Sequence, residues 1–447
     1  MATITERTYI KDLKAQEGQE VLIKGWVDVR RDQGKLIFLD FRDKSGVVQG
    51  VILPNAKEAH EVGARLRPEW VVSVHGKVNK RPEKNVQAEK LNGDIELEIL
   101  GIEVLSEAKE LPFEKDTELN LDTYLDHLPL TLRTDRAKDI FTMQATLVDE
   151  YRKSLQKQDF TEFQAPALVG GDAEGGAAAF KVDYYYDKTA FLATSPQFYK
   201  QIMVGVFEKA FTIAKIFRGE KHATSRHLSE LTQMDFEMGF INDHLDIMAV
   251  LENVIRDVVN AAASKHADIF TRFNVPVPQL AEKFPILTLL EAQEIIEKEF
   301  GGKAVGEQDL EPEHERQICE WALKEKGCDF VFITHFPTKK RAFYTYADGK
   351  DPSLSKSFDL LFRGLEINSG SQRIHNYDEL VEKMKSRGLD PEKFSFYLQA
   401  FKYGMPPHGG SSTGLERLTA RMLNLANVKE ASDFPRDLNR IDTLLSK

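Results

Sequence analysis

The chain has 447 residues, of which 42% are hydrophobic and 29% charged, and a formal net charge of −11. This length predicts two or more domains, and no apolar run approaches the ~20 residues that a membrane-spanning helix needs. The acidic total argues against a nonspecific nucleic-acid binder. It is compatible with a local basic groove, because the field near a ligand depends on how the charges are distributed.

The first residues, MATITERTYIKDL, contain neither an apolar core nor a small-residue cleavage site, so we expect no secretory signal. Cys319 and Cys328 are the two cysteines of the chain. They are too few for a disulfide framework and wrongly spaced for a zinc knuckle. Because such cysteines fit a reducing compartment, we expect a cytoplasmic protein without a membrane partner.

Five short alternating segments predict the strands of a small barrel in the first hundred residues. They are EVLIKGWVDVRR, KLIFLDFRD, GVVQGVIL, WVVSVHGKVNKR and DIELEILGIEVL. DQGK and DKSG supply turns, and NAKEAHEVGARL predicts one helix. Five strands with one helix are what an OB-fold barrel requires, so we assign this fold to residues 1–107.

Residues 108–135 are polar with little periodicity and predict a hinge. From residue 136 the pattern changes to a long helix, followed by a strand that Pro166 interrupts. Within 136–447, further helices are predicted at 244–265, 288–300, 309–326, 377–388, 392–402 and 412–425, and strands at 178–193, 210–218, 231–241, 328–335, 341–347 and 357–370. Because these elements do not alternate strictly, we expect an α+β domain with a largely antiparallel sheet flanked by helices.

The stretch FRGEKHATSRHLSELTQMDFEM (217–238) joins two predicted strands through a polar loop. Period-2 alternation places Gln233, Asp235 and Glu237 on one face of the second strand. Arg218, at the end of the first strand, has the planar group that binds phosphate oxygens bidentately. An exposed hairpin with salt bridges is the alternative. The question is whether the polar face meets water or a substrate.

In SFDLLFRGLEINSGSQRIHN (357–376), Arg363-Gly364 resembles a hairpin turn. With a two-residue turn there, the predicted pairs are Leu361 with Glu366 and Asp359 with Asn368. Asp359 and Glu366 then share one face of adjacent strands. Two carboxylates so placed favour a magnesium site, whose other ligands are substrate phosphates. Solvated strand ends are the alternative.

Three further segments carry weaker signals. PPHGGSSTGLERLTARML (406–423) leads small residues into a helix that starts near Arg417, but it lacks the Gly-Lys-Ser/Thr ending of a Walker A loop. GGDAEGGAAAF (170–180) predicts a lid-like loop and not a dinucleotide fingerprint. In TSPQFYKQIMVG, Gln197 and Lys200 share a face at a helix start, with surface solvation as the alternative for Lys200.

Together these segments resemble the class II aminoacyl-tRNA synthetases and, within them, the compact archaeal/eukaryotic aspartyl-tRNA synthetases. FTEFQAPALVGG resembles motif 1, with Pro166 as its marker, which builds the family's dimer interface. FRGE…RHLSE…QMDFE resembles motif 2, GLERL with its following helix resembles motif 3, and NVKEASDFPRD resembles the family's usual end. The barrel is similar to the family's anticodon-binding domain.

The resemblance implies an ATP-dependent, AMP-forming aspartate–tRNA ligase. Such an enzyme converts L-aspartate and ATP to aspartyl-adenylate and pyrophosphate, then transfers aspartate to the 3′ end of tRNA(Asp), with tRNA(Asn) left open as a second acceptor. Mg²⁺ is the implied cofactor, and a homodimer is the implied assembly. An asparagine–tRNA ligase, a tRNA-independent amino-acid-activating paralogue and a nonenzymatic RNA-binding protein are the alternatives.

The resemblance also implies site residues. The implied catalytic residues are Arg218, Glu220 and Arg417. The implied aspartate-binding residues are Glu174, Gln197, Lys200, Arg218, Asp235, Ser369 and Arg373. The implied ATP-binding residues are Arg218, Gly219, Glu220, Arg226, His227, Leu228, Glu366, Gly414, Leu415, Glu416 and Arg417. The implied metal ligands are Asp359, Glu366 and Ser369, and the implied anticodon contacts are Arg31, Phe38 and Gln49.

Lys200 and Arg373 would pair with the substrate's side-chain carboxylate, since a nearby cation favours a charged group over a neutral amide. They would repel a lysine substrate. The chain departs from the family pattern at GGSSTGLER, where Ser411, Ser412 and Thr413 add bulk to a stretch that is usually Gly-Phe-Gly-Leu-Gly. It also departs at Gly219, where alanine is usual.

Overall fold

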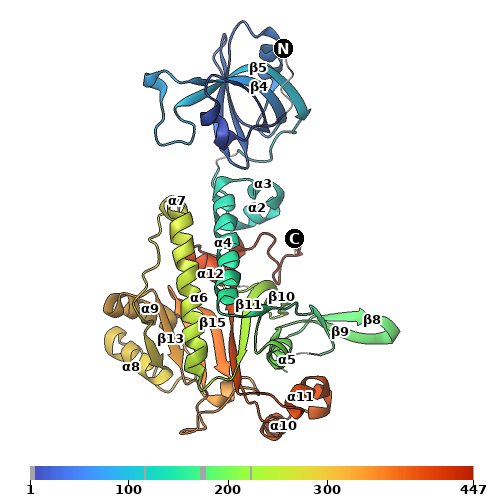
Figure 1. The fold of residues 1–447 in the computed structure, drawn as a ribbon, viewed down its shortest axis with the longest axis vertical. Coiled ribbons are helices and arrows are strands. Elements are labelled where there is room, and N and C mark those ends of the chain that lie inside the picture. The colour runs from blue at the N-terminus through green and yellow to red at the C-terminus, as the bar shows by residue number, and fades with distance from the viewer. Residues whose placement is uncertain (1–5, 115–116, 172–177, 222–223, 446–447) are drawn as a thin grey trace. The chain divides into compact units, whose positions relative to one another are not determined.

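The structure is a computed structural model that describes residues 6–114, 117–171, 178–221 and 224–445. The chain folds as two units, Met1–Glu118 and Leu119–Lys447, and Figure 1 draws the first mainly in blue. The second unit begins inside the segment 108–135, where α2 (Leu121–Asp126) and α3 (Leu128–Thr131) lie. Within the described ranges, no helix combines the length and the apolarity needed to cross a membrane.

The first unit is a closed barrel with the strand order β1-β2-β3-β5-β4. Its elements are β1 (Glu20–Asp32), β2 (Ile37–Asp43), β3 (Gly46–Ile52), α1 (Lys57–Arg65), β4 (Val71–Lys80) and β5 (Ile95–Ser106). Alternate residues of β2, such as Leu39 and Phe41, lie in a buried apolar core, whereas Phe38 and Asp40 lie on the outer face. The predicted OB-fold barrel is confirmed.

The second unit is built on a sheet of eight strands in the order β12-β13-β14-β15-β16-β11-β10-β6. Most neighbours are antiparallel, while β12–β13 and β10–β6 are parallel. The strands are β6 (Thr161–Glu162), β10 (Lys209–Phe217), β11 (Glu230–Gly239), β12 (Ile286–Thr288), β13 (Phe330–Thr334), β14 (Ser357–Phe362), β15 (Leu365–Gln372) and β16 (His408–Gly414). The predicted α+β class with an antiparallel-rich sheet is confirmed.

Helices α4 (Asp135–Lys157), α6 (His244–Lys265) and α12 (Leu415–Met422) pack with one face of this sheet around a large apolar core (Figure 1). Met234 and Phe236 of β11 point into that core. The other helices are α5 (Gln197–Phe207), α7 (Ala267–Arg272), α8 (Leu289–Phe300), α9 (Pro312–Lys326), α10 (Tyr377–Ser386) and α11 (Ser395–Lys402). Short 3-10 helices span Ile10–Gln16, Glu83–Asn85, Tyr185–Asp187, Thr338–Lys340, Pro391–Phe394 and Val428–Ala431. By alternation, the polar residues of β11 point to the opposite face, where the site lies.

The predicted hairpin turn between β14 and β15 is present. Arg363 and Gly364 both have positive φ, 46° and 77°, as a two-residue turn that follows the twist of its strands requires. Leu361 pairs with Glu366, as expected. The turn chemistry was therefore visible in the sequence.

The rest of that hairpin is shifted by one residue. A β-bulge lies between Leu360 and Leu361, so that Leu360 pairs with Asn368 and Asp359 pairs with Ser369. The predicted pairing of Asp359 with Asn368 is wrong, because counting from the turn cannot detect an extra residue in one strand.

Two predicted strands are also wrong. The segment 178–193 holds two strands, β8 (Lys181–Tyr184) and β9 (Lys188–Leu192), which form a small sheet with β7 (Leu168–Val169). The segment 341–347 forms no strand and is tied to its neighbours by isolated bridges. Its alternating aromatic residues pack as a loop against α10 and α11, in a core that includes Phe343 and Tyr344.

Candidate active site

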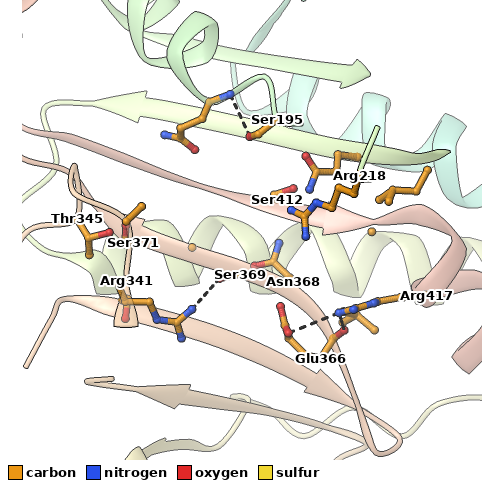
Figure 2. Close-up of a pocket in the computed structure, with 18 of the residues that line it drawn as sticks. Ser195, Arg218, Arg341, Thr345, Glu366, Asn368, Ser369, Ser371, Ser412 and Arg417 are labelled. Carbon is orange, nitrogen blue, oxygen red and sulfur yellow. Dashed lines mark hydrogen bonds and ion pairs between the residues drawn. The ribbon is translucent and has the colours of Figure 1, made fainter. Parts of the chain in front are cut away.

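A pocket of about 380 Å³ opens over β11, β15 and β16, within the roughly 300–1,000 Å³ usual for small-molecule sites. The predicted residues that line it are Gln197, Lys200, Arg218, Glu220, Arg226, His227, Leu228, Glu366, Ser369, Arg373, Gly414, Glu416 and Arg417. Figure 2 shows Arg218, Arg341, Glu366 and Arg417 around one cavity, although they come from different elements. The polar face of 231–238 is buried on the side of this pocket, so the solvent-exposed alternative is wrong.

Four buried charged side chains cluster at one end of the pocket, which we call the buried end: Lys200 and Arg373, which line the pocket, and Asp235 and Glu237, which pair with them. Lys200 Nζ lies 2.9 Å from Asp235 Oδ2 and 3.5 Å from Glu237 Oε2. Arg373 Nε lies 2.9 Å from Glu237 Oε1. The two predicted cations therefore converge, from α5 and from the end of β15, on the single carboxylate of Glu237. The side chains of Lys200 and Glu237 are 1% and 0% exposed.

Glu237 reaches this position because its cross-strand neighbour is Gly410. A Cβ at Gly410 would lie 2.2 Å from Glu237 Oε2, a distance that no side chain tolerates. Burial acts to raise the pKa of Glu237, but Arg373 and Lys200 hold the pKa below its ordinary value. The carboxylate is therefore charged, and the buried end contains two cations and two anions.

A second layer of neutral groups holds the buried end in place. Gln197 Nε2 donates to Gln201 Oε1 at 3.0 Å, and Tyr397 Oη donates to the same oxygen at 3.1 Å. Gln201 Nε2 lies 2.9 Å from His408 Nε2, while His408 Nδ1 lies 2.9 Å from the carbonyl of Pro406. Burial lowers the pKa of His408 to about 4. A neutral His408 that donates from Nδ1 and accepts at Nε2 satisfies both contacts.

The opposite end of the pocket, which we call the open end, is lined by Arg218, Arg341, Glu366 and Arg417, and the buried Asp359 pairs with Arg341 there. Arg417 Nη1 donates to the backbone oxygen of Glu366 at 3.0 Å and lies 3.5 Å from Glu366 Oε2 (Figure 2). Glu366 lines the pocket with its side chain 36% exposed, and desolvation together with the negative charge of Asp359 raises its pKa to about 7. Arg218 Nε is buried without a hydrogen-bond partner.

Asp359 and Ser369 are joined by an arginine that sequence reasoning missed. Arg341 Nη2 lies 2.6 Å from Asp359 Oδ2, and Arg341 Nη1 donates to Ser369 Oγ at 3.3 Å (Figure 2). Its guanidinium lies 3.9 Å from the ring centre of Phe336. Arg341 lies in the segment wrongly predicted as a strand, and its KKR context resembles an ordinary charged surface, so no local signal marks it.

The predicted metal ligands fit a magnesium ion that takes most of its ligands from substrate and water. Asp359 Oδ1 is buried without a partner, and Glu366 is a second carboxylate close enough to feel the charge of Asp359. Among the described residues, no group of three or more His, Cys, Asp or Glu side chains could hold a metal alone. Magnesium typically binds one or two carboxylates with phosphate oxygens and waters, so two carboxylates suffice.

The loop of the motif-2-like hairpin is held by α9. Arg226 Nη1 lies 2.9 Å from Glu315 Oε2, and Arg226 Nη2 donates to the Gly364 oxygen at 3.0 Å. Glu315 was missed, although its place on the apolar side of α9, three and four residues before Ile318 and Cys319, was a usable signal. His227 lies in the same loop, with its Nδ1 2.6 Å from Thr224 Oγ1.

The remaining predicted ATP contacts fall into two groups. Glu220 and Gly414 line the pocket, and the Gly219 N–H donates to the Ala178 oxygen at 2.6 Å. By contrast, Leu415 packs in the apolar core, and Leu228 lines the pocket while contributing to that core. The carboxylate of Glu416 accepts the backbone N–H of Thr232 at 3.0 Å, which joins α12 to β11. Glu174 lies outside the described residues.

The barrel brings its three predicted contacts together on its outer face. Arg31 is paired with Phe38 across β1 and β2, and Asp40 with Gln49 across β2 and β3. Arg31 Nη2 lies 2.9 Å from Asp40 Oδ1 and donates to Gln49 Oε1 at 3.2 Å. Phe38 is half-buried and lies outside the barrel core, so the core-aromatic alternative is wrong. Asp40 was missed, although it follows Phe38 by two residues on the same face.

Comparisons with known proteins agree with both units. A family model described as class II tRNA synthetases (D, K and N) matches residues 120–438, and one described as an OB-fold nucleic acid binding domain matches residues 21–105. The aspartate–tRNA(Asp/Asn) ligase of Thermus thermophilus is 44% identical over 97% of this chain and 99% of its own length. The protein of the same name from Deinococcus radiodurans is 39% identical over 99% of this chain and 100% of its own. The asparaginyl-tRNA synthetase of Pyrococcus horikoshii, solved with asparaginyl-adenylate, has a TM-score of 0.90 and 31% identity over 98% of this chain and 100% of its own.

Proposed function

Because the chain belongs to the class II tRNA synthetases of the D, K and N group, we propose that it is an aspartate–tRNA ligase. It activates L-aspartate with ATP to aspartyl-adenylate and pyrophosphate, then transfers the aspartyl group to the 3′ end of tRNA. The observation that carries this proposal is the convergence of Lys200 and Arg373 in one buried corner of the pocket. The full-length similarity to the Thermus and Deinococcus aspartate ligases supports it.

The buried end selects an acidic amino acid. Lys200 and Arg373 share Glu237, so the carboxylate of an aspartate side chain can approach two cations that Glu237 already holds in place. Bidentate Arg–carboxylate geometry adds directional specificity. Asp235 and Gln197 supply acceptors for the substrate's ammonium group. A neutral amide at the same position gains less Coulomb energy.

At the open end, Arg218 and Arg417 orient ATP for in-line transfer. The α-carboxylate oxygen of aspartate attacks the α-phosphorus, the bond to the bridging oxygen breaks, and pyrophosphate leaves with the electron pair. Arg218 has an unpartnered donor and binds the α-phosphate, while Arg417 binds the far end of the triphosphate. Such groups stabilise the charge that develops in the transition state.

Glu366, Asp359 and Ser369 would hold Mg²⁺, which supplies charge neutralisation to the phosphates when bound. Arg341, which pairs with Asp359, sits at the same carboxylate and competes for it. The pairing keeps one of the two carboxylates neutralised in the absence of nucleotide. This arrangement reduces the repulsion between Asp359 and Glu366.

In the second step, the terminal ribose hydroxyl of tRNA attacks the aspartyl carbonyl carbon. The ester bond forms, the bond between that carbon and the phosphate oxygen breaks, and AMP leaves with the hydroxyl proton on its phosphate. The outer-face cluster of the barrel, Arg31, Phe38, Asp40 and Gln49, binds the anticodon by base stacking and base-edge contacts. We propose tRNA(Asp) and tRNA(Asn) as acceptors, as in the names of the Thermus and Deinococcus relatives.

We also propose a cytoplasmic homodimer formed through the motif-1-like segment around Pro166. Leu168 in β7 and Phe434 near the C-terminus are 41% and 58% exposed, as apolar residues at an interface would be in a single subunit. Sedimentation of the purified chain tests this, with a dimer expected and a monomer at micromolar concentration contradicting it.

The activity is tested by pyrophosphate exchange into ATP with each amino acid, followed by charging of purified tRNA(Asp) and tRNA(Asn). We expect exchange with aspartate in the absence of tRNA, and charging of both tRNAs. Exchange without any charging would support the tRNA-independent paralogue instead.

Asparagine ligation is the second candidate, favoured by the structural likeness to the Pyrococcus asparaginyl enzyme. Exchange with asparagine at a kcat/KM above that for aspartate would establish it. The Lys200→Met variant sharpens the distinction. In an aspartate enzyme it lowers kcat/KM for aspartate far more than for asparagine, because the lost cation attracts the charged carboxylate of aspartate more strongly than the neutral amide of asparagine.

A further inference from the structure

Ser411, Ser412 and Thr413 place three hydroxyls in a row along one strand, and the structure gives them different environments. All three lie in β16, where alternation sends Ser412 to the pocket face and the other two to the opposite face. Ser411 and Thr413 are fully buried, and both accept from Asn368 Nδ2, at 3.1 and 2.7 Å. Ser412 is only partly buried and lines the pocket.

Ser412 lies in the middle of a row of polar side chains that crosses the sheet. It is the cross-strand partner of Asp235 in β11 and of Ser369 in β15, and Ser369 is the partner of Asp359 in β14. Adjacent strands lie ~4.8 Å apart, so the row spans about 14 Å. It joins the buried end of the pocket to the open end. Residues directly opposite each other share a face.

The Ser412 hydroxyl holds one oxygen of Asp235. Ser412 Oγ donates to Asp235 Oδ1 at 2.6 Å, and Lys200 Nζ donates to Asp235 Oδ2 at 2.9 Å. Donors on both oxygens fix the plane of the carboxylate. An ionised carboxylate has about four acceptor positions, so lone pairs remain for a third donor. Asp235 itself is 0% exposed.

We propose that Ser412 is a positioning residue for the amino-acid substrate: it orients the Asp235 carboxylate toward the substrate's ammonium group. The inference rests on the proposed function, since it assumes an amino acid in the pocket. It gives Ser412 a role at the amino-acid side of the site. Without this hydroxyl, Asp235 Oδ1 would lose its donor, while Lys200 would still hold Oδ2.

The test compares Ser412→Ala and Ser412→Thr with Thr413→Val, a control on the adjacent residue that faces away from the pocket. Pyrophosphate exchange gives the KM for L-aspartate and for ATP, and competition gives the Ki for succinate, which has both carboxylates of aspartate but no ammonium. We expect Ser412→Ala to raise the aspartate KM about 10- to 100-fold, as for loss of a hydrogen bond to a charged group. The ATP KM and the succinate Ki should stay within about twofold, and Ser412→Thr should restore the aspartate KM.

Equal weakening of aspartate and succinate by Ser412→Ala would overturn the inference, because it would show a general effect on the pocket. An unchanged aspartate KM, or the same rise in Thr413→Val, would overturn it as well. In all these outcomes the parent enzyme still exchanges pyrophosphate with aspartate. A parent chain that shows no such exchange would overturn the proposed function and the inference together.

Discussion

The two ends of the pocket differ in how completely their polar atoms are paired. At the buried end, every charged group of Lys200, Asp235, Glu237 and Arg373 has a partner within the protein. At the open end, Arg218 Nε, Arg341 Nε and Asp359 Oδ1 are buried without one. A site for a small substrate such as an amino acid can have all its polar atoms paired within the protein, because that substrate replaces or adds few contacts. A site for a triphosphate and its metal leaves donors and acceptors unpaired for the ligand to satisfy.

If the two ends differ in this way, substitutions at the open end should lower the catalytic rate while changing the stability of the fold little. Arg218→Ala should lower kcat for aspartate-dependent exchange by on the order of 10³-fold, about 4 kcal/mol, since it removes a preorganised donor to the reacting phosphate. The midpoint of thermal unfolding should stay within about 2 °C. Lys215→Ala lies in β10, which ends directly before Arg218, and its side chain is 54% exposed; it is the matched control and should change neither.

The same substitution at the two ends should then separate stability from activity. Glu237→Gln leaves two buried cations with one carboxylate, and we expect the free energy of unfolding to fall by about 3 kcal/mol. Glu366→Gln removes repulsion between carboxylates and should change stability by under about 1 kcal/mol, while ATP-dependent activity is lost. Chemical denaturation followed by circular dichroism measures both. Equal destabilisation would break the comparison.

A pH experiment tests the layer behind the buried end. The pKa of His408 is about 4 in the folded chain and ordinarily about 6.5 when unfolded. The unfolded chain alone therefore takes up this proton between those values, so His408 lowers stability as pH falls from 6.5 to 4, by at most about 3 kcal/mol. His408→Gln should lack this contribution, so the stability difference between parent and variant should change with pH in that window and be constant above pH 7. A difference that stays constant from pH 7 to 4 would contradict the assignment.

The smallest effect is expected outside the pocket. Phe38→Ala should raise the KM for tRNA about 5- to 150-fold, the 1–3 kcal/mol typical of one stacked base. It should leave pyrophosphate exchange unchanged, because neither end of the pocket is altered. Leu105→Ala, at a residue of β5 that is 47% exposed, should affect neither measurement. A loss of exchange in Phe38→Ala would mean that the barrel supports activation itself.

Period and turn chemistry made much of this molecule predictable. The barrel strands, the helices and the Arg363-Gly364 turn follow from local patterns, and the predicted Lys200 and Arg373 both line one pocket. Pairing partners were harder. Glu237 appeared as one member of a polar face, but its position between the two cations depends on α5 and the end of β15 meeting it in space.

Arg341 could not be found from its surroundings in the sequence, since a loop packed on aromatic residues imitates an alternating strand. Ser412 was visible as a departure from the family pattern, but its partner was not. A hydroxyl in a short glycine-rich strand has two faces to choose from, and only the register of β16 against β11 decides that it meets Asp235.

The bulge between Leu360 and Leu361 also sets the phase of everything that follows it in β15. The extra residue lies in β15, where Ile367 stands between the partners of Leu361 and Leu360. In a hairpin without the bulge and with every residue kept, Asp359 would pair with Asn368, so Asn368 and Ser369 would exchange sides. The Asn368 amide would then lie opposite Asp359, where the Ser369 hydroxyl now lies. The apolar side of the sheet would have to accommodate Ser369. Alignments and redesigns of this hairpin that count from its turn will therefore misassign the residues proposed to hold the metal, whereas those anchored at Ser369 will not.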